Sequence, residues 1–273
     1  MELSGTLPFI VKLFGRKKMP KRKFDFSIVI PCFNEEERIL STLNKIVSFM
    51  NSYNPSYEII IVDDGSKDGT VKLINNYIST RDNIFLIENP HKGKGFAVRT
   101  GILMSEGKYV LMTDADLATP IEELKRLLVW IEGNNYDIVI ASREGLGAKR
   151  NEEPFLRHLM GRVFNLLIKI IVGLFYKDTQ CGFKLFKGEQ AREMFNRLIL
   201  FGDSSKIVKH PKVTAFDVEV LVIAKNDGLK VKEIPVAWTY VPTKRVSAIR
   251  DSLLMLLEIS KIRINDLLGK YKK

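Results

Sequence analysis

The feature of this sequence that most constrains its fold is a regular alternation between Phe26 and Ser142. Short runs rich in β-branched residues alternate there with amphipathic stretches of helical length. This alternation predicts strand–helix–strand units, which build a mainly parallel α/β sheet. The expected strands are Ser27–Ile30, Glu58–Val62, Ile84–Ile87, Tyr109–Met112 and Asp137–Ile140. Because these runs are almost continuously apolar, we expect helices to cover both faces of the sheet.

Helices are expected between the strands and in the C-terminal half, and Pro120 suits the first turn of one of them. The expected helices are Glu35–Met50, Ile121–Glu132, Phe155–Tyr176, Asp217–Asn226 and Ser247–Leu268, and two further strand-like pieces are Thr179–Phe186 and Lys230–Tyr240. The pattern favours one main domain over residues 26–245. A distinct segment, 1–25, precedes it, and an amphipathic basic helix, 246–273, follows it.

Bulk composition limits the classes of protein and partner. A chain of 273 residues with 45% hydrophobic residues can bury a substantial core, which excludes disorder throughout. The two cysteines, Cys32 and Cys181, are too few for a disulfide framework and lack any zinc-binding spacing. A net charge of +11 suits nucleic acid, anionic lipid or a phosphorylated small molecule. Because the sequence has no RNA-binding or helix-turn-helix motif, we expect no nucleic-acid partner.

Several segments suit contact with a membrane surface. Residues 1–25 place an apolar patch before a basic cluster, which is the order of an interfacial anchor, with a basic tail as the alternative. The expected helix Phe155–Tyr176 has one polar stripe, formed by His158, Arg162, Asn165 and Lys169. Such a helix suits a membrane interface and equally a buried position with one wet face. Because Lys169 interrupts the longest apolar run, we expect no membrane-spanning helix.

Two acidic loops follow expected strands. Asp114 and Asp116 come directly after Tyr109–Met112, so both carboxylates can converge on one hard cation, Mg²⁺ or Mn²⁺, bridging a diphosphate. Asp64 lies in the other loop, where a carboxylate can bind a nucleobase or ribose or cap the next helix. In an open parallel sheet, ligands bind at the carboxyl ends of the strands. The two loops therefore predict a nucleotide site.

The order of three motifs resembles the family 2 glycosyltransferases, which have the GT-A fold. The motifs are Ile30-Pro31-Cys32-Phe33-Asn34-Glu35-Glu36, Val62-Asp63-Asp64-Gly65-Ser66 and Asp114-Ala115-Asp116. Within that family, the segments 178–186 and 215–219 are similar to the dolichyl-phosphate glucosyltransferase branch. The resemblance implies an α/β, Rossmann-like GT-A catalytic domain with a mainly parallel central sheet, accompanied by amphipathic membrane-interface helices.

The resemblance also implies roles for individual residues. Nucleotide-sugar binding is expected of Pro31, Phe33, Glu35, Asp64, Lys94, Asp114 and Asp116; metal binding of Asp114 and Asp116; and lipid-phosphate binding of Arg143, Arg157, Arg162, Lys244, Arg245 and Ser247. The expected catalytic residues are Asp116, Arg143 and Asp217. For Asp217 two roles stay open: a base, or a group that orients sugar hydroxyls or a lysine. Related mannose synthases commonly have glutamine where this chain has Ala118, so a metal here would have one protein ligand fewer.

The activity implied by the resemblance is inverting transfer of a hexose from a nucleotide-sugar, with UDP-glucose favoured, to dolichyl or polyprenyl phosphate. The expected place is the cytoplasmic face of a membrane. A phosphate monoester is largely a dianion at neutral pH, so a strong general base is unnecessary. The alternatives are transfer of mannose or N-acetylhexosamine to the same acceptor and a family 2 transferase with a saccharide acceptor. Outside the enzymes, a basic nucleic-acid-binding protein or a membrane scaffold remains.

Overall fold

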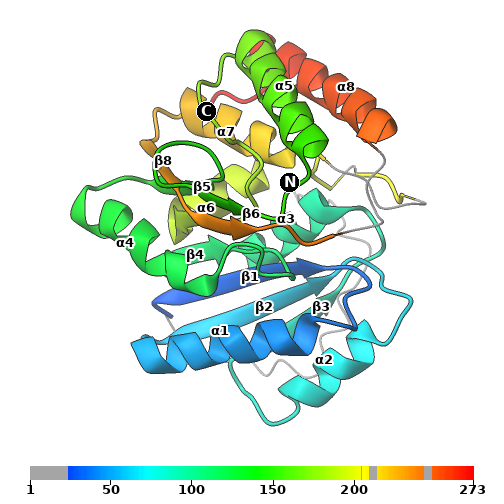
Figure 1. Ribbon diagram of the computed structural model, residues 1–273, viewed down its shortest axis with the longest axis vertical. Helices are drawn as coiled ribbons and strands as arrows, with labels where there is room; N and C mark the ends of the chain where they lie inside the picture. The colour runs from blue at the N-terminus through cyan, green and yellow to red at the C-terminus, as the bar shows by residue number, and fades with distance from the viewer. Residues whose placement is uncertain (1–23, 204, 209–213, 243–247) are drawn as a thin grey trace, which may run out of the picture.

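A seven-stranded sheet forms the centre of the computed structural model, which describes residues 24–203, 205–208, 214–242 and 248–273 (Figure 1). The strands are β1 (Phe26–Cys32), β2 (Tyr57–Asp63), β3 (Ile84–Glu88), β4 (Tyr109–Met112), β5 (Ile138–Ser142), β7 (Lys184–Lys187) and β8 (Val231–Pro235), in the order β3-β2-β1-β4-β7-β5-β8. Only β7 runs antiparallel to its neighbours, β4 and β5. The structure confirms the mainly parallel sheet and all five strands expected before residue 143.

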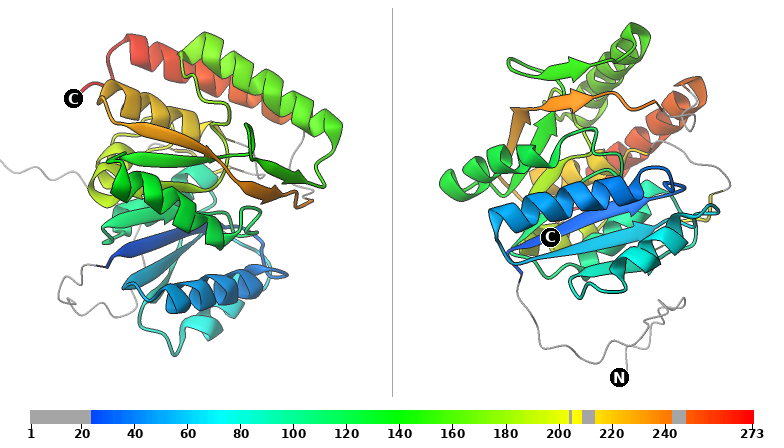
Figure 2. Two further views of the ribbon diagram at one scale, coloured as in Figure 1. Left: turned by 60° about the vertical axis from the view of Figure 1, so that its left-hand side comes forward. Right: turned by 60° about the horizontal axis from the view of Figure 1, so that its bottom comes forward.

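Helices cover both faces of the sheet. On one side lie α1 (Ile39–Tyr53), α2 (Thr70–Ile78), the short 3-10 turn η1 (Ile121–Glu123) and α4 (Leu124–Gly133). On the other side lie α3 (Lys94–Met104), α6 (Gly188–Asn196) and α7 (Phe216–Asn226). Beyond α7, α5 (Phe155–Val172) and α8 (Ala248–Leu267) lie side by side, at the end of the molecule opposite α1 and α2 (Figures 1 and 2).

Two expected elements have different bounds. The first helix was expected from Glu35, but α1 begins at Ile39, because the preceding residues bind the loop after β2. The Glu35 amide donates to Thr70 Oγ1 (2.7 Å), and Glu36 Oε2 accepts from the Gly69 amide (2.6 Å). The helix expected over Phe155–Tyr176 ends at Val172, where Gly173 adopts a left-handed conformation with φ of 71°.

The two late strand-like pieces are shorter than expected. Of the piece Thr179–Phe186, only the end forms β7, because residues 179–183 cross over the end of β4 toward Asp114. The piece Lys230–Tyr240 breaks at Val236 into β8 and β9 (Ala237–Thr239), and β9 pairs with β6 (Lys149–Asn151) in a separate two-stranded sheet.

The C-terminal helix packs into the main core. Met255, Ile259 and Ile262 of α8 are buried against α5 and α7. Beyond α8, Tyr271 is also buried, and its hydroxyl donates to Glu219 Oε1 of α7 (2.7 Å). In the described part of the chain, no helix has the length and hydropathy needed to cross a bilayer.

The topology determines where a ligand can bind. From β1 the chain adds β2 and then β3 on one side, and it then returns to place β4 on the other side of β1, so the sheet order reverses between β1 and β4. The loops after β1, β2 and β4 meet at this edge, which is where open α/β sheets bind ligands. Both acidic loops therefore lie at the expected position.

Candidate active site

Two carboxylates lie together in the loop after β4. Asp116 Oδ1 accepts a hydrogen bond from the Ala118 amide (3.0 Å), and this tight turn places Leu117 in the left-handed region with φ of 46°. Burial, followed by the neighbouring Asp114 charge, raises the pKa of Asp116 above its ordinary value. Two anions that share so small a space favour a cation between or beside them.

Lys94 supplies one positive charge to this pair. It is the first residue of α3, and its Nζ lies 2.5 Å from Asp114 Oδ1. Burial opposes protonation, but the carboxylates of Asp114 and Asp217 outweigh it and raise the pKa of Lys94. Because its side chain is 38% exposed, the ammonium can also reach an incoming anion.

Gly182 makes room for Asp114. A Cβ atom built on Gly182 would lie 2.0 Å from Asp114 Oδ2 and 2.4 Å from its Cγ. Only a residue without a side chain permits this approach, so the crossing segment and the loop after β4 fit together at this point.

Behind this contact, a buried ion pair joins β7 to α7. Lys184 Nζ lies 2.5 Å from Asp217 Oδ1 and donates to the Cys181 carbonyl (2.6 Å). Both side chains are buried. Burial raises the pKa of Asp217, although the Lys184 and Lys94 charges oppose the shift. Asp217 is therefore buried against Lys184, and the choice between its two expected roles remains a prediction.

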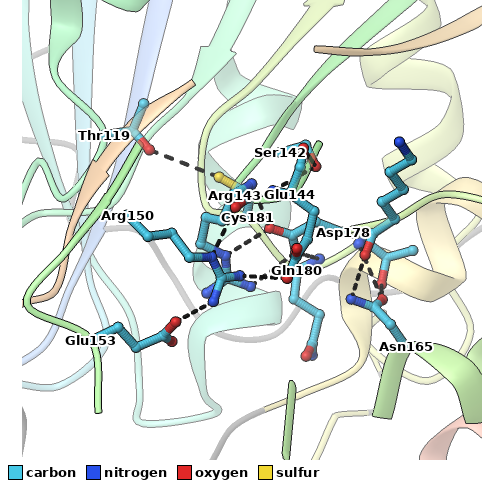
Figure 3. A network of polar contacts seen from close by, with 12 residues as sticks. Thr119, Ser142, Arg143, Glu144, Arg150, Glu153, Asn165, Asp178, Gln180 and Cys181 are labelled. Atoms are coloured by element: carbon cyan, nitrogen blue, oxygen red, sulfur yellow. Dashed lines mark hydrogen bonds and ion pairs between the residues drawn. The ribbon is translucent and has the colours of Figure 1, made fainter. Parts of the chain in front are cut away.

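Arg143, which follows β5, faces the buried Asp178 (Figure 3). Its Nε donates to Asp178 Oδ2 (2.7 Å) and its Nη2 to Oδ1 (2.9 Å), and the backbone amide adds a third bond. Burial raises the pKa of Asp178, but Arg143 and its hydrogen bonds outweigh burial and hold it at about 2. This bidentate pair fixes the guanidinium plane and leaves its other N–H groups for additional acceptors.

A second layer of polar contacts ties α5 to the same segment (Figure 3). Asn165 Nδ2 donates to the Lys177 carbonyl (2.7 Å), and Asn165 Oδ1 accepts from the Thr179 hydroxyl (3.3 Å). On the other side, Arg150 Nε donates to the Arg143 carbonyl (2.8 Å). The segment that carries Asp178 and Gly182 is thus held by the helix α5 and by β5.

The loop after β2 forms the other half of the site. Asp64 Oδ1 accepts from the Lys92 and Gly93 amides (2.9 and 3.0 Å), and His91 Nδ1 lies 2.7 Å from Asp64 Oδ2. The His91 ring stacks on Phe33, with centroids 4.3 Å apart and an interplanar angle of 8°. Asp64 thus holds the turn that begins α3, and the turn positions the His91 ring against Phe33 in the loop after β1.

The donor set suits a magnesium or manganese ion only if the substrate completes it. Within the described ranges, no group of three or more His, Cys, Asp or Glu side chains has the geometry of a metal site. Mg²⁺ commonly binds through one or two carboxylates plus substrate phosphates and water. Asp114 and Asp116 fit that pattern. Burial and the Asp114 charge raise the pKa of Asp116, and a bound cation would lower it.

Comparison with known proteins identifies the family. The model of glycosyl transferase family 2 matches residues 27–196, which include both acidic loops and the Gly182 segment. The chain is a family 2 glycosyltransferase. The resemblance seen in the sequence motifs is therefore confirmed.

Several relatives of this glycosyltransferase carry one name. The chain is 38% identical to dolichyl-phosphate beta-glucosyltransferase of Dictyostelium discoideum over 271 residues, covering 93% of this chain and 79% of the relative. It is 33% identical to the Saccharomyces cerevisiae protein of that name over 268 residues, covering 90% and 76%. Both similarities extend well beyond the segment matched by the family model.

Solved structures confirm the GT-A fold of this glycosyltransferase. Mannosyl-3-phosphoglycerate synthase from Rubrobacter xylanophilus has a TM-score of 0.63 at 18% identity, covering 90% of this chain and 75% of that chain. A mannosyltransferase from Pyrobaculum calidifontis, solved in complex with GDP-Man and Mn²⁺, has a TM-score of 0.58 at 20% identity, covering 90% and 65%.

The residues expected at the site fall into three groups. Phe33, Glu35, Asp64, Lys94, Asp114 and Asp116 lie in or next to the loops at the sheet edge, and Pro31 lies at the end of β1. Arg162 lies on α5, where its Nη1 is 3.4 Å from Glu144 Oε2. Lys244, Arg245, Ser247 and the side chain of Arg157 lie outside the described residues. Their expected roles remain predictions.

Four residues that shape the site have no role predicted from the sequence motifs. Gly182, Lys184 and Asp178 belong to the segment that carried the family resemblance, and His91 precedes a glycine-rich turn. A usable signal was present for Lys184, which is the one charge in the run Phe183-Lys184-Leu185-Phe186, whereas Asp178 lies among polar residues. Burial of both charges requires partners, and only the tertiary structure identifies those partners as Arg143 and Asp217.

We predict that Gly182→Ala lowers turnover of a nucleotide-sugar donor on the order of 100-fold, because displacement of Asp114 by about 1 Å disturbs the reacting geometry. The midpoint of urea unfolding should change little, since the carboxylate can move aside. The matched control is Gly133→Ala in α4, where an added Cβ meets nothing within 4 Å. Wild-type turnover in Gly182→Ala would show that the close contact has no role.

We also predict that Asp116→Asn stabilises the fold while abolishing activity. Because the pKa of Asp116 is raised in the folded state, the wild-type protein loses stability as pH rises from about 3.8, the ordinary value, through the folded pKa. The variant lacks this loss, so its free energy of unfolding should exceed that of the wild type by about 1 kcal/mol at neutral pH. Urea unfolding at a series of pH values, without divalent metal, measures this difference.

The control for that series is Asp68→Asn, which should behave in the opposite sense. Hydrogen bonds from Thr70 outweigh burial and lower the pKa of Asp68. Ionised Asp68 therefore contributes stability above its unfolded pKa and loses it as pH falls. If Asp116→Asn is less stable than the wild type at neutral pH, the proposed repulsion with Asp114 is wrong.

Proposed function

We propose that this glycosyltransferase transfers glucose from UDP-glucose to dolichyl phosphate, with inversion at the anomeric carbon. The observation that carries the proposal is the carboxylate pair with Lys94 at the sheet edge, in a chain whose relatives are named dolichyl-phosphate beta-glucosyltransferases. The site gathers groups that bind anions and a cation. Asp217 is buried and paired with Lys184, which disfavours a role as a base.

Asp114 and Asp116 would hold Mg²⁺ or Mn²⁺, which would neutralise charge on the diphosphate of the donor. Lys94 can turn from Asp114 Oδ1 to a phosphate oxygen, because its side chain is partly exposed. The Phe33–His91 stack offers a flat aromatic surface for a nucleobase beside the loop that Asp64 holds. Together these residues would orient the donor with its leaving group against positive charge.

In the proposed reaction, an oxygen of the acceptor phosphate attacks the anomeric carbon while the bond from that carbon to the diphosphate oxygen breaks. The acceptor phosphate is largely a dianion at neutral pH, so no proton need be removed. Arg143 is held rigid by Asp178 and has N–H groups left for a second phosphate. The chain's main task would be to hold two anions close together.

The proposed acceptor is a membrane lipid, and the outer surface of α5 and α8 suits a bilayer. Large apolar side chains are exposed on both helices and on the residues after them: Phe155, Leu159, Val163, Leu166, Ile170 and Phe175 on one, and Leu253, Leu257, Ile264, Leu267 and Leu268 on the other. We call this surface the α5/α8 face. Contiguous exposed apolar area of this kind is unusual on proteins without a partner. We propose that the α5/α8 face rests in the cytoplasmic surface of a membrane.

Transfer of labelled sugar from a panel of UDP- and GDP-sugars to dolichyl phosphate in detergent micelles tests the reaction. We expect glycolipid from UDP-glucose with Mg²⁺ or Mn²⁺ present, and at least about 100-fold less with Asp116→Ala. Asp82→Ala, a change in an exposed loop, is the matched control and should retain full transfer. Absence of glycolipid from any donor, with the protein folded, would exclude a lipid-phosphate acceptor.

Sedimentation with phosphatidylcholine vesicles tests the α5/α8 face. Ile170 and Phe175 are 71% and 82% exposed, and replacing either by aspartate should weaken binding about tenfold or more, because an inserted side chain contributes roughly 2 kcal/mol. Val129→Asp on α4, where Val129 is 61% exposed, is the matched control and should bind as the wild type does. If the aspartate variants of Ile170 and Phe175 sediment with the vesicles as fully as Val129→Asp does, this face is not the membrane contact.

A further inference from the structure

A cavity of about 550 Å³ lies beside α5, between that helix, the turn after Arg143 and Lys177. Its volume is in the range of small-ligand sites. Its lining includes three cationic side chains, Arg162, Lys169 and Lys177, and one carboxylate, Glu144. None of the residues described as the carboxylate pair or its partners lines it, so this cavity is separate from the sheet edge.

The charges in the cavity favour an anion. Glu144 is already engaged, since Arg150 Nη2 lies 3.1 Å from its Oε1 and Arg162 Nη1 lies 3.4 Å from its Oε2. In the part of the chain that the structure describes, neither Lys169 nor Lys177 forms an ion pair. Two lysines of the lining therefore have no paired carboxylate among the described residues, and the one lining carboxylate, Glu144, is shared by two arginines, an arrangement that suits a phosphate.

The same cavity opens on the α5/α8 face. Val163 and Leu166, which line it, are 52% and 56% exposed and belong to the apolar surface of α5. An occupant would thus meet both cationic and apolar side chains. This combination matches an anion that carries an apolar tail and lies at a membrane surface.

Hydrogen bonds within the chain hold two residues of the cavity lining, Asn165 and Lys177. Asn165 lines it and joins α5 to the Lys177 carbonyl (2.7 Å), so the helix and Lys177 are held at a fixed separation. Lys177 is also tied through its amide to Glu233 Oε2 (2.9 Å). An occupant would therefore not need to order the backbone around it, which favours binding.

We propose that this cavity binds the phosphate headgroup of an anionic bilayer lipid, apart from the acceptor that reacts at the sheet edge. The inference rests on the proposed action at a membrane surface. Such a site would hold the enzyme on anionic membranes and fix the orientation of the α5/α8 face. The reacting phosphate must reach the donor that the carboxylate pair would hold, whereas a headgroup needs only the two lysines and the apolar wall.

The test is binding of the full chain to vesicles of phosphatidylcholine alone or with added phosphatidate, in the absence of donor. Lys169→Gln/Lys177→Gln should lose about tenfold in affinity for the phosphatidate vesicles and little for the neutral ones. The matched control, Lys261→Gln/Lys272→Gln, removes the same charge from exposed positions on and after α8 and should lose about threefold or less.

Three outcomes would overturn the proposal. Equal losses in both double variants would mean diffuse attraction without a site. No loss in either would mean that the cavity binds no headgroup. A raised KM for dolichyl phosphate in neutral micelles, with vesicle binding unchanged, would assign the cavity to the acceptor. Wild-type transfer in micelles reports on the proposed reaction independently of all three outcomes.

Discussion

The close contact between Gly182 and Asp114 is the constraint on which the site depends. It brings a segment from after α5 onto the loop after β4, which are distant in sequence. The antiparallel strand β7 follows from it, since the chain must return between β4 and β5 once it has crossed the sheet edge. Because Gly182 has no side chain, the Asp114 carboxylate can lie against the segment that carries Asp178 and Lys184.

Alternating charges run inward from that contact. In order they are Asp114, Lys94, Asp217, Lys184, Asp178 and Arg143. Each buried charge has an opposite neighbour, which is the condition for keeping ions inside a protein. The arrangement explains why Asp217 is held as an internal counter-ion, and it makes the exposed end, Lys94 with Asp114, the part that can exchange a protein partner for a substrate phosphate.

Helix α5 connects this site to the outer surface. Phe164, Ile168 and Val172 bury one side of it in the core, while other apolar residues are exposed on the far side. Within its polar stripe, Asn165 donates to the Lys177 carbonyl in the segment that leads to Gly182, whereas the side chain of Arg162 is 62% exposed. A bilayer in contact with the α5/α8 face would thus lie one helix away from the segment that shapes the carboxylate pair.

The sequence by itself determined the fold class and the main binding edge. Buried parallel strands require nearly continuous apolar runs, and carboxylates that follow such runs must lie at the carboxyl edge of the sheet. Local patterns of this kind also predicted α7 and α8 to within about one residue at each end.

Only the tertiary structure decided which charges pair and which side of α5 is exposed. Asp64 accepts hydrogen bonds from the turn that contains His91 and Lys92, a contact that no local pattern indicated, and its expected contact with a nucleotide remains a prediction. The sequence likewise did not indicate that Asp217 is buried against Lys184. Periodicity records that a helix has polar and apolar sides, but the partner of each side depends on contacts between residues far apart in the chain, which no local pattern encodes.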